Sequence, residues 1–189
     1  MDKESVTLTY NSGDTSLELP VLEGSVGPKA FDVTRVYKKT GMFTFDPGFM
    51  ATASCRSAIT YIDGEKGILR YRGIPIEQFV DNPNFLEVAW LLIFGSLPDK
   101  EEYGRFSNIL TGTANIDEAM KQNFMGFPRT APPMAILSAM INALSCYHPE
   151  FHELHDPKEF EAAAGRLISK VRTIAAFAYR RSHGLPFIY

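Results

Sequence analysis

The sequence has few cysteines and no long apolar run. Its two cysteines, Cys55 and Cys146, are too few for the disulfide framework of a small secreted protein. We therefore expect both to be buried free thiols. The longest apolar run, residues 88–94, is far shorter than the roughly 20 residues that span a bilayer, and the N-terminus does not resemble a signal peptide. These absences predict a cytoplasmic protein.

The sequence also lacks a strong excess of positive or negative charge. The 189 residues include 19 basic and 22 acidic side chains, which gives a net charge of -3 without a basic stripe. Binding to a nucleic-acid backbone needs such a stripe, so nucleic acid is excluded as a partner. Hydrophobic residues make up 45% and charged residues 22%, which is typical of a packed globular protein rather than a disordered chain.

Familiar catalytic and phosphate-binding motifs are absent. No GxGxxG, GxxxxGK[ST] or GxSxG pattern occurs, so the residues alone predict neither a nucleotide loop nor a nucleophile elbow. Three of the four histidines, His148, His152 and His155, fall within eight residues and raise the question of a metal site. Pro149 interrupts that stretch, and we interpret the three as solvated loop histidines. No metal is predicted.

The first 72 residues are typical of β structure. Residues 6–10 and 16–19 alternate apolar and polar side chains around turn-forming residues 11–14, which predicts a hairpin. A second hairpin is predicted from strands at 58–62 and 68–72, because glycines in the intervening turn permit positive φ.

Residues 73–189 are typical of helices. A helix is predicted over residues 85–94, capped by Asn84 and ended by Gly95. Asp99 opens another, and Pro132–Pro133 precede an apolar helix expected to be central to the core. Its predicted buried stripe comprises Met134, Leu137, Ile141 and Leu144.

A last helical stretch is predicted to begin at Asp156–Pro157 and to reach Ser182. It is either one helix or two. Gly184 and Pro186 follow it and end the helical pattern.

A series of short motifs, in order along nearly the whole chain, is similar to the N-terminal part of bacterial-type citrate synthases. The motifs are FTFDPGF at 43–49, ITYIDG at 59–64, RGIPI at 72–76, FLEVA at 85–89, GSLP at 95–98, PMA at 133–135, RLISK at 166–170 and GLPFIY at 184–189. The resemblance implies a mainly α fold: an incomplete citrate-synthase-like helical large domain at 73–189, with a small β-hairpin segment at 1–72.

The resemblance also implies an activity, the condensation of acetyl-CoA with oxaloacetate in the tricarboxylic acid cycle. The family's histidine motifs, His-Ala-Asp-His-Glu and Gly-Pro-Ala-His-Gly-Gly, do not occur in these 189 residues. We therefore assign no catalytic residue, and expect a truncated chain that is inactive by itself. Two alternatives stay open: a non-catalytic assembly or regulatory subunit, and a fragment of 2-methylcitrate synthase, which uses propionyl-CoA.

Hexameric, NADH-sensitive members of the family carry an inhibitory nucleotide site. By position, Tyr147, Arg166 and Lys170 correspond to three of its residues, while Gly112-Thr113-Ala114 replaces an Arg-His-Thr run of the same site. The alternative is that these are ordinary surface basic residues. No cofactor is implied; the partners are small-molecule substrates and, in the complete enzyme, other copies in a dimer or hexamer. Arg172 stands where the family usually has a proline.

Overall fold

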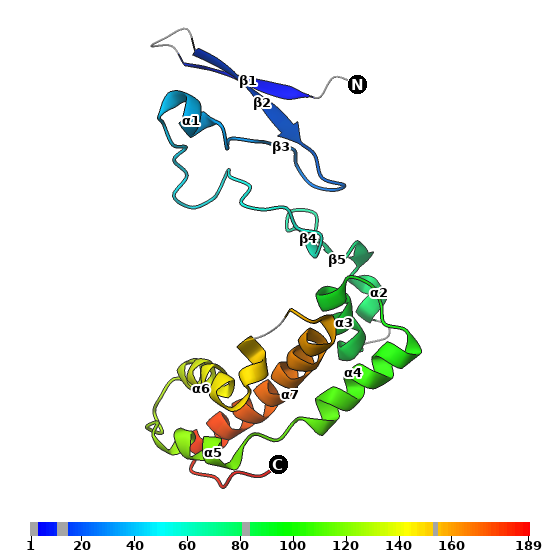
Figure 1. Ribbon diagram of the computed structural model, residues 1–189, viewed down its shortest axis with the longest axis vertical. Helices are drawn as coiled ribbons and strands as arrows, with labels where there is room; N and C mark the ends of the chain where they lie inside the picture. The colour runs from blue at the N-terminus through cyan, green and yellow to red at the C-terminus, as the bar shows by residue number, and fades with distance from the viewer. Residues whose placement is uncertain (1–3, 11–14, 81–83, 153–154) are drawn as a thin grey trace. The chain divides into compact units, whose positions relative to one another are not determined.

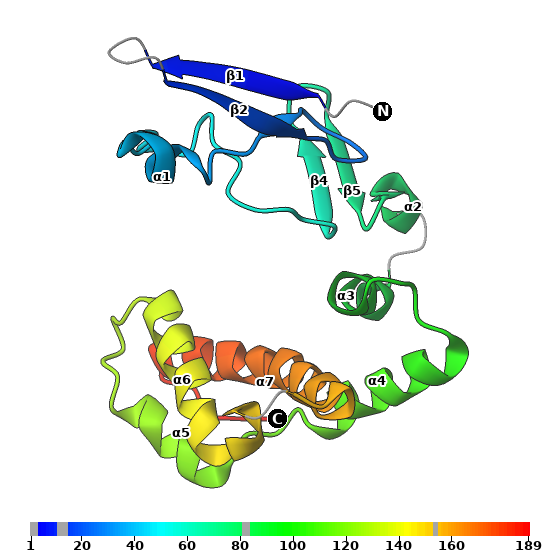
Figure 2. The ribbon, with the colours of Figure 1, turned by 45° about the horizontal axis from the view of Figure 1, so that its top comes forward.

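The structure is a computed structural model that describes residues 4–10, 15–80, 84–152 and 155–189. The predicted turn at 11–14 lies outside these ranges. The chain divides into two compact units, residues 1–83 with 91–96, and residues 84–90 with 97–189. Figures 1 and 2 show the elements of each unit.

The first unit begins with the predicted hairpin. Strands β1 (Ser5–Tyr10) and β2 (Thr15–Leu22) pair antiparallel, and β2 also pairs with β3 (Ala30–Phe31) (Figure 1). Alternation along β2 turns Leu17 and Leu19 to one face, where they form a small core with Val36 at the start of α1 (Val36–Thr40).

The second predicted hairpin is also confirmed. Strands β4 (Thr60–Asp63), β5 (Ile68–Tyr71) and β6 (Ile74–Pro75) form an antiparallel sheet followed by α2 (Glu77–Val80). Arg72 leaves the hairpin with a φ of 49°, and its guanidinium donates to the Leu92 carbonyl at 2.8 Å. That bond fixes the second half of α3 to this unit.

The segment between the two sheets is irregular and exposed. The Asp46 carboxylate accepts hydrogen bonds from the backbone N–H groups of Ala51 and Met50 and from the Thr52 hydroxyl, which hold its pKa below the ordinary value. The prediction that Cys55 is buried is wrong, because Cys55 lies in an irregular run, residues 53–59, in which every residue is exposed.

The second unit is helical, and the predicted helix starts are confirmed. Its helices are α3 (Phe85–Phe94, shared with the first unit), α4 (Lys100–Gly112), α5 (Glu118–Met125), α6 (Pro133–Tyr147) and α7 (Pro157–Ser182), with a 3-10 turn η1 (Pro149–His152). Asp99 and Glu102 form a reciprocal capping box, and Asp156 caps α7 through Lys158 and Glu159 N–H. The stretch from 157 to 182 is one helix.

Helix α7 lies between α4 and α6 (Figure 1), and the main core forms where it meets α5 and α6. On α6 the predicted central position is confirmed but the predicted stripe is partly wrong. The buried side chains are Ile136, Met140 and Leu144, whereas Met134 is 70% exposed. Cys146 is exposed as well, because it lies two residues, about 200° of helical rotation, beyond Leu144.

No helix in the described ranges is long and apolar enough to cross a membrane. The predicted fold class, mainly helical with small β-hairpins, is confirmed.

Candidate functional site

Polar side chains of α7 bind the carbonyls at the end of α4 and in the connection to α5. Thr173 donates to the Ala114 carbonyl at 2.6 Å and Lys170 to the Asn115 carbonyl, while Ser169 and Arg172 both donate to the Leu110 carbonyl. The last carbonyls of a helix lack partners within it, so α7 satisfies them from outside. This bonding fixes the α4–α5 connection on one side of α7.

Lys170 is buried beneath that connection. Lys170 is only 5% exposed. This burial lowers the pKa of its ammonium group, and the nearby positive charge of Arg166 lowers it further. The carboxylates of Asp117 and Glu150 act in the opposite direction. The alternative that Lys170 is an ordinary surface residue is therefore wrong.

Arg166, one turn before Lys170, is paired within the chain. Its guanidinium donates to Glu150 of η1, and the His148 ring nitrogen Nδ1 lies 3.2 Å from the same carboxylate oxygen. The backbone N–H of Glu150, with the charges of Arg166 and His148, holds the pKa of this carboxyl below its ordinary value. An internal carboxylate thus occupies the position at which an external anion would meet Arg166.

Tyr147 is the last residue of α6 and packs half-buried against the main core. The three residues predicted for the NADH site therefore lie around η1: Tyr147 precedes it, and Arg166 faces it from α7 with Lys170 within electrostatic reach. Whether they bind NADH stays a prediction. No pattern in the sequence indicated that Glu150 pairs with Arg166.

The histidines do not gather into a metal site in the described part of the chain, where no cluster of three potential ligands is found. His148 is engaged by Glu150 and His155 is exposed. The structure does not describe the side chain of His152.

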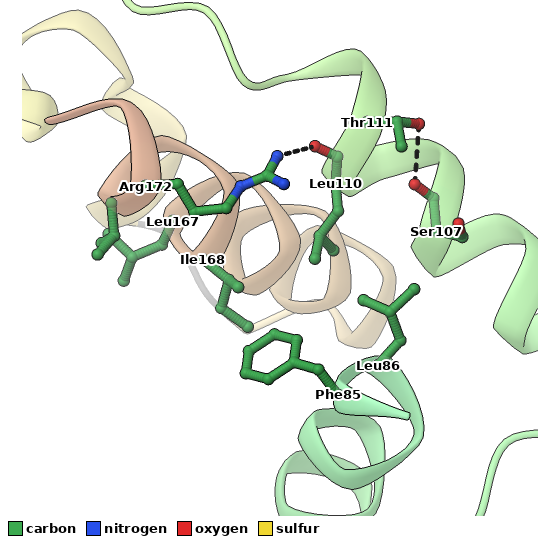
Figure 3. Close-up of a pocket in the computed structure, with 9 residues that line it drawn as sticks. Phe85, Leu86, Ser107, Leu110, Thr111, Leu167, Ile168 and Arg172 are labelled. Atoms are coloured by element: carbon green, nitrogen blue, oxygen red, sulfur yellow. Dashed lines mark hydrogen bonds between the residues drawn. The ribbon is translucent and has the colours of Figure 1, made fainter. Parts of the chain in front are cut away.

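A separate apolar pocket, which the sequence did not predict, lies within the helical unit. Its volume is about 600 Å³, and Figure 3 shows the side chains of Phe85 and Ile168 pointing toward one another across it. The lining residues are Phe85 and Leu86 of α3, Ser107, Leu110 and Thr111 of α4, and Leu167, Ile168, Val171 and Arg172 of α7.

The burial of Lys170 predicts a pH effect on stability. A lysine whose pKa is lowered on folding loses its proton in the folded state first, so the unfolded chain binds more protons between that lowered pKa and 10.5. Stability then rises with pH across this window. Urea unfolding measures the free energy of unfolding of wild type and of Lys170→Met at increasing pH. The wild-type value should rise relative to that of the variant as the pH approaches 10.5. A difference between the two that stays constant over this range would contradict the burial of Lys170.

Comparison with known proteins identifies the class to which this helical arrangement belongs. The model of the family described as citrate synthase, C-terminal domain, matches residues 48–189. The chain therefore belongs to the citrate synthase family.

Three solved citrate synthases are similar in structure. That of Pyrobaculum aerophilum is 29% identical with a TM-score of 0.67, covering 79% of this chain and 41% of its own. That of Thermotoga maritima is 27% identical with a TM-score of 0.63, covering 77% and 37%. That of Thermoplasma acidophilum, solved with carboxymethyl coenzyme A and oxaloacetate, is 22% identical with a TM-score of 0.63, covering 73% and 36%, and supports the fold alone. The chain thus matches well under half the length of each structure.

Proposed function

We propose that this chain is part of the scaffold of a citrate synthase, an acyltransferase that condenses acetyl-CoA with oxaloacetate and water to citrate and CoA in the cytoplasm. The observation that carries the proposal is the family match over residues 48–189, joined to TM-scores of 0.63 to 0.67 against solved citrate synthases. A 2-methylcitrate synthase, which takes propionyl-CoA, is the close alternative within the same reaction class.

We further propose that the 189-residue chain does not catalyse this reaction by itself. Removing a proton next to a thioester carbonyl needs a positioned base and a donor for the developing enolate. In the described ranges the titratable groups near the candidate site are already paired, Glu150 with Arg166 and His148, and Lys170 with the Asn115 carbonyl. Neither of the family's histidine motifs occurs in the sequence.

The test is thioester consumption by the purified chain with oxaloacetate and either acetyl-CoA or propionyl-CoA. The reaction should be monitored by the loss of thioester absorbance, because a thiol reagent that detects released CoA would also react with the exposed Cys55 and Cys146. We expect no consumption with either substrate. Oxaloacetate-dependent loss of either thioester would refute the proposed inactivity, and the preferred substrate would identify the enzyme.

A non-catalytic subunit is a second candidate, favoured by one observation on α6. The exposed Met134 lines a groove on α6 together with the half-buried Leu137 and Ile141 and the polar Ser138 and Asn142, and this apolar surface could contact another copy or a full-length relative. Light scattering separates the possibilities. A defined oligomer that Met134→Glu dissociates supports a subunit, whereas polydisperse aggregates that bind hydrophobic dyes support an incomplete enzyme.

The proposed NADH site leads to a prediction about Glu150. Its carboxylate competes with a phosphate for Arg166, so Glu150→Gln should tighten NADH binding by about tenfold, the effect of freeing one charge-assisted hydrogen bond. Titration calorimetry measures the change. Glu118→Gln, which removes a carboxylate paired with Lys121 on α5, is the matched control and should leave the affinity unchanged. Equal effects of the two variants would count against a site at Arg166.

A further inference from the structure

The pocket between α3, α4 and α7 has the size and lining of a small-ligand site. Its volume of about 600 Å³ falls within the range of roughly 300 to 1,000 Å³ typical of such sites. Phe85, which forms one wall, is 68% exposed, and Leu167 on the opposite helix is 38% exposed. An apolar ligand that covers these side chains removes their surface from water, which favours binding.

Arg172 lies at the edge of this pocket, and no carboxylate among the described residues pairs with its positive charge. Its guanidinium donates to the Leu110 carbonyl and the Ser169 hydroxyl, each at 3.1 Å, and to the Ser169 carbonyl at 3.3 Å. All three acceptors are neutral, and no ion pair in the described residues includes Arg172. Hydrogen bonds to neutral oxygens orient the guanidinium but leave its charge uncompensated.

We propose that this pocket binds a single-chain amphipathic carboxylate, an alkanoate of about eight to twelve carbons, a size suited to a cavity of this class. The alkyl chain lies among Phe85, Leu86 and Ile168, and the carboxylate lies at the Arg172 guanidinium. The Nη1 group carries none of the three hydrogen bonds described above, and a charge-assisted hydrogen bond from it to a carboxylate is about twice as strong as one to a neutral head group.

The first experiment compares ligands on the full 189-residue chain. Trp90, the only tryptophan, is buried on α3, the helix that supplies Phe85 and Leu86, and its fluorescence reports binding. Decanoate should bind saturably, one per chain and about fifteenfold more tightly than octanoate, because it has two more methylenes and each buried methylene contributes about fourfold in affinity. The neutral 1-decanol should bind more weakly than decanoate. Equal binding of the two, or the absence of saturable binding, would overturn the proposal.

The second experiment removes the charge. Arg172→Met should lower the affinity for decanoate about tenfold and leave the affinity for 1-decanol unchanged. The unchanged 1-decanol affinity would show that the variant retains its pocket. Arg180→Met, which removes another α7 guanidinium that binds a backbone carbonyl outside the pocket, is the matched control and should change neither affinity. If Arg172→Met weakens both ligands equally or neither, the carboxylate does not lie at Arg172 and the proposal fails.

Discussion

Replacing Phe177 by alanine should cost about 3 to 5 kcal/mol of unfolding free energy, the range for a large aromatic removed from a close-packed core. The side chain is fully buried on α7 and stacks on Phe187, with ring centroids 4.6 Å apart and planes 11° from parallel. It also meets Phe124 of α5 edge-on at 5.9 Å and Tyr189 at 5.4 Å. One ring thus joins α5, α7 and the C-terminal residues.

Urea unfolding followed by circular dichroism measures this loss. Tyr179→Ala is the matched control, since Tyr179 is an aromatic on the same helix two residues later but 60% exposed, and should change stability by less than about 1 kcal/mol. The C-terminal residues provide a second readout. Losing Phe187's stacking partner should weaken the hydrogen bond from the Tyr189 hydroxyl to the Ile116 carbonyl and raise amide exchange there. Equal costs for the two alanine variants would contradict this packing.

Replacing Gly165 by alanine should destabilise the helical unit, although alanine is the better helix former. A Cβ at this buried position on α7 would lie 2.6 Å from Cγ2 and 3.3 Å from Cβ of Ile109 on α4. Ile109 is β-branched and adjusts poorly. The overpacking cost of about 1 to 3 kcal/mol exceeds the gain of about 1 kcal/mol in helix propensity, so we expect a net loss of about 1 kcal/mol.

The sign of the effect is the informative result. Gly104→Ala, on α4, would place a Cβ with no atom within 4 Å and should stabilise the chain by about 0.5 to 1 kcal/mol. In an Ile109→Ala background the obstructing methyl is absent, so Gly165→Ala should become favourable there. Stabilisation by Gly165→Ala in the wild-type background would show that α4 and α7 do not approach as closely as described.

Helix starts were predictable because their signals are local. Asp99, Asp156 and Pro157 occupy the first positions of α4 and α7, and a capping side chain needs only its own first turn to act. Helix α5 was not predicted, although Asp117 caps it and Met120 and Phe124 lie one turn apart on its buried face. It has only eight residues, and so short an amphipathic pattern is easily missed.

The candidate site was predictable only in part. The four-residue spacing of Arg166 and Lys170 indicates a shared helix face, which any α7 would provide. Their partners depend on packing between distant segments: Lys170 is 55 residues from Asn115, and Arg166 is 16 residues from Glu150. Which side of a helix is covered depends on these tertiary contacts, and the same limit explains why Cys146 and Met134 were expected to be buried.

The most direct test of the account is citrate formation by the purified, helical chain. Labelled acetyl-CoA and oxaloacetate should be incubated with the chain at high concentration, and citrate measured by mass spectrometry beside a circular dichroism spectrum of the same sample. We predict a folded, helical protein that forms no citrate above the protein-free background. Citrate formation that depends on oxaloacetate and is lost on heating the protein would contradict the central claim that these residues form a scaffold and not a complete catalytic site.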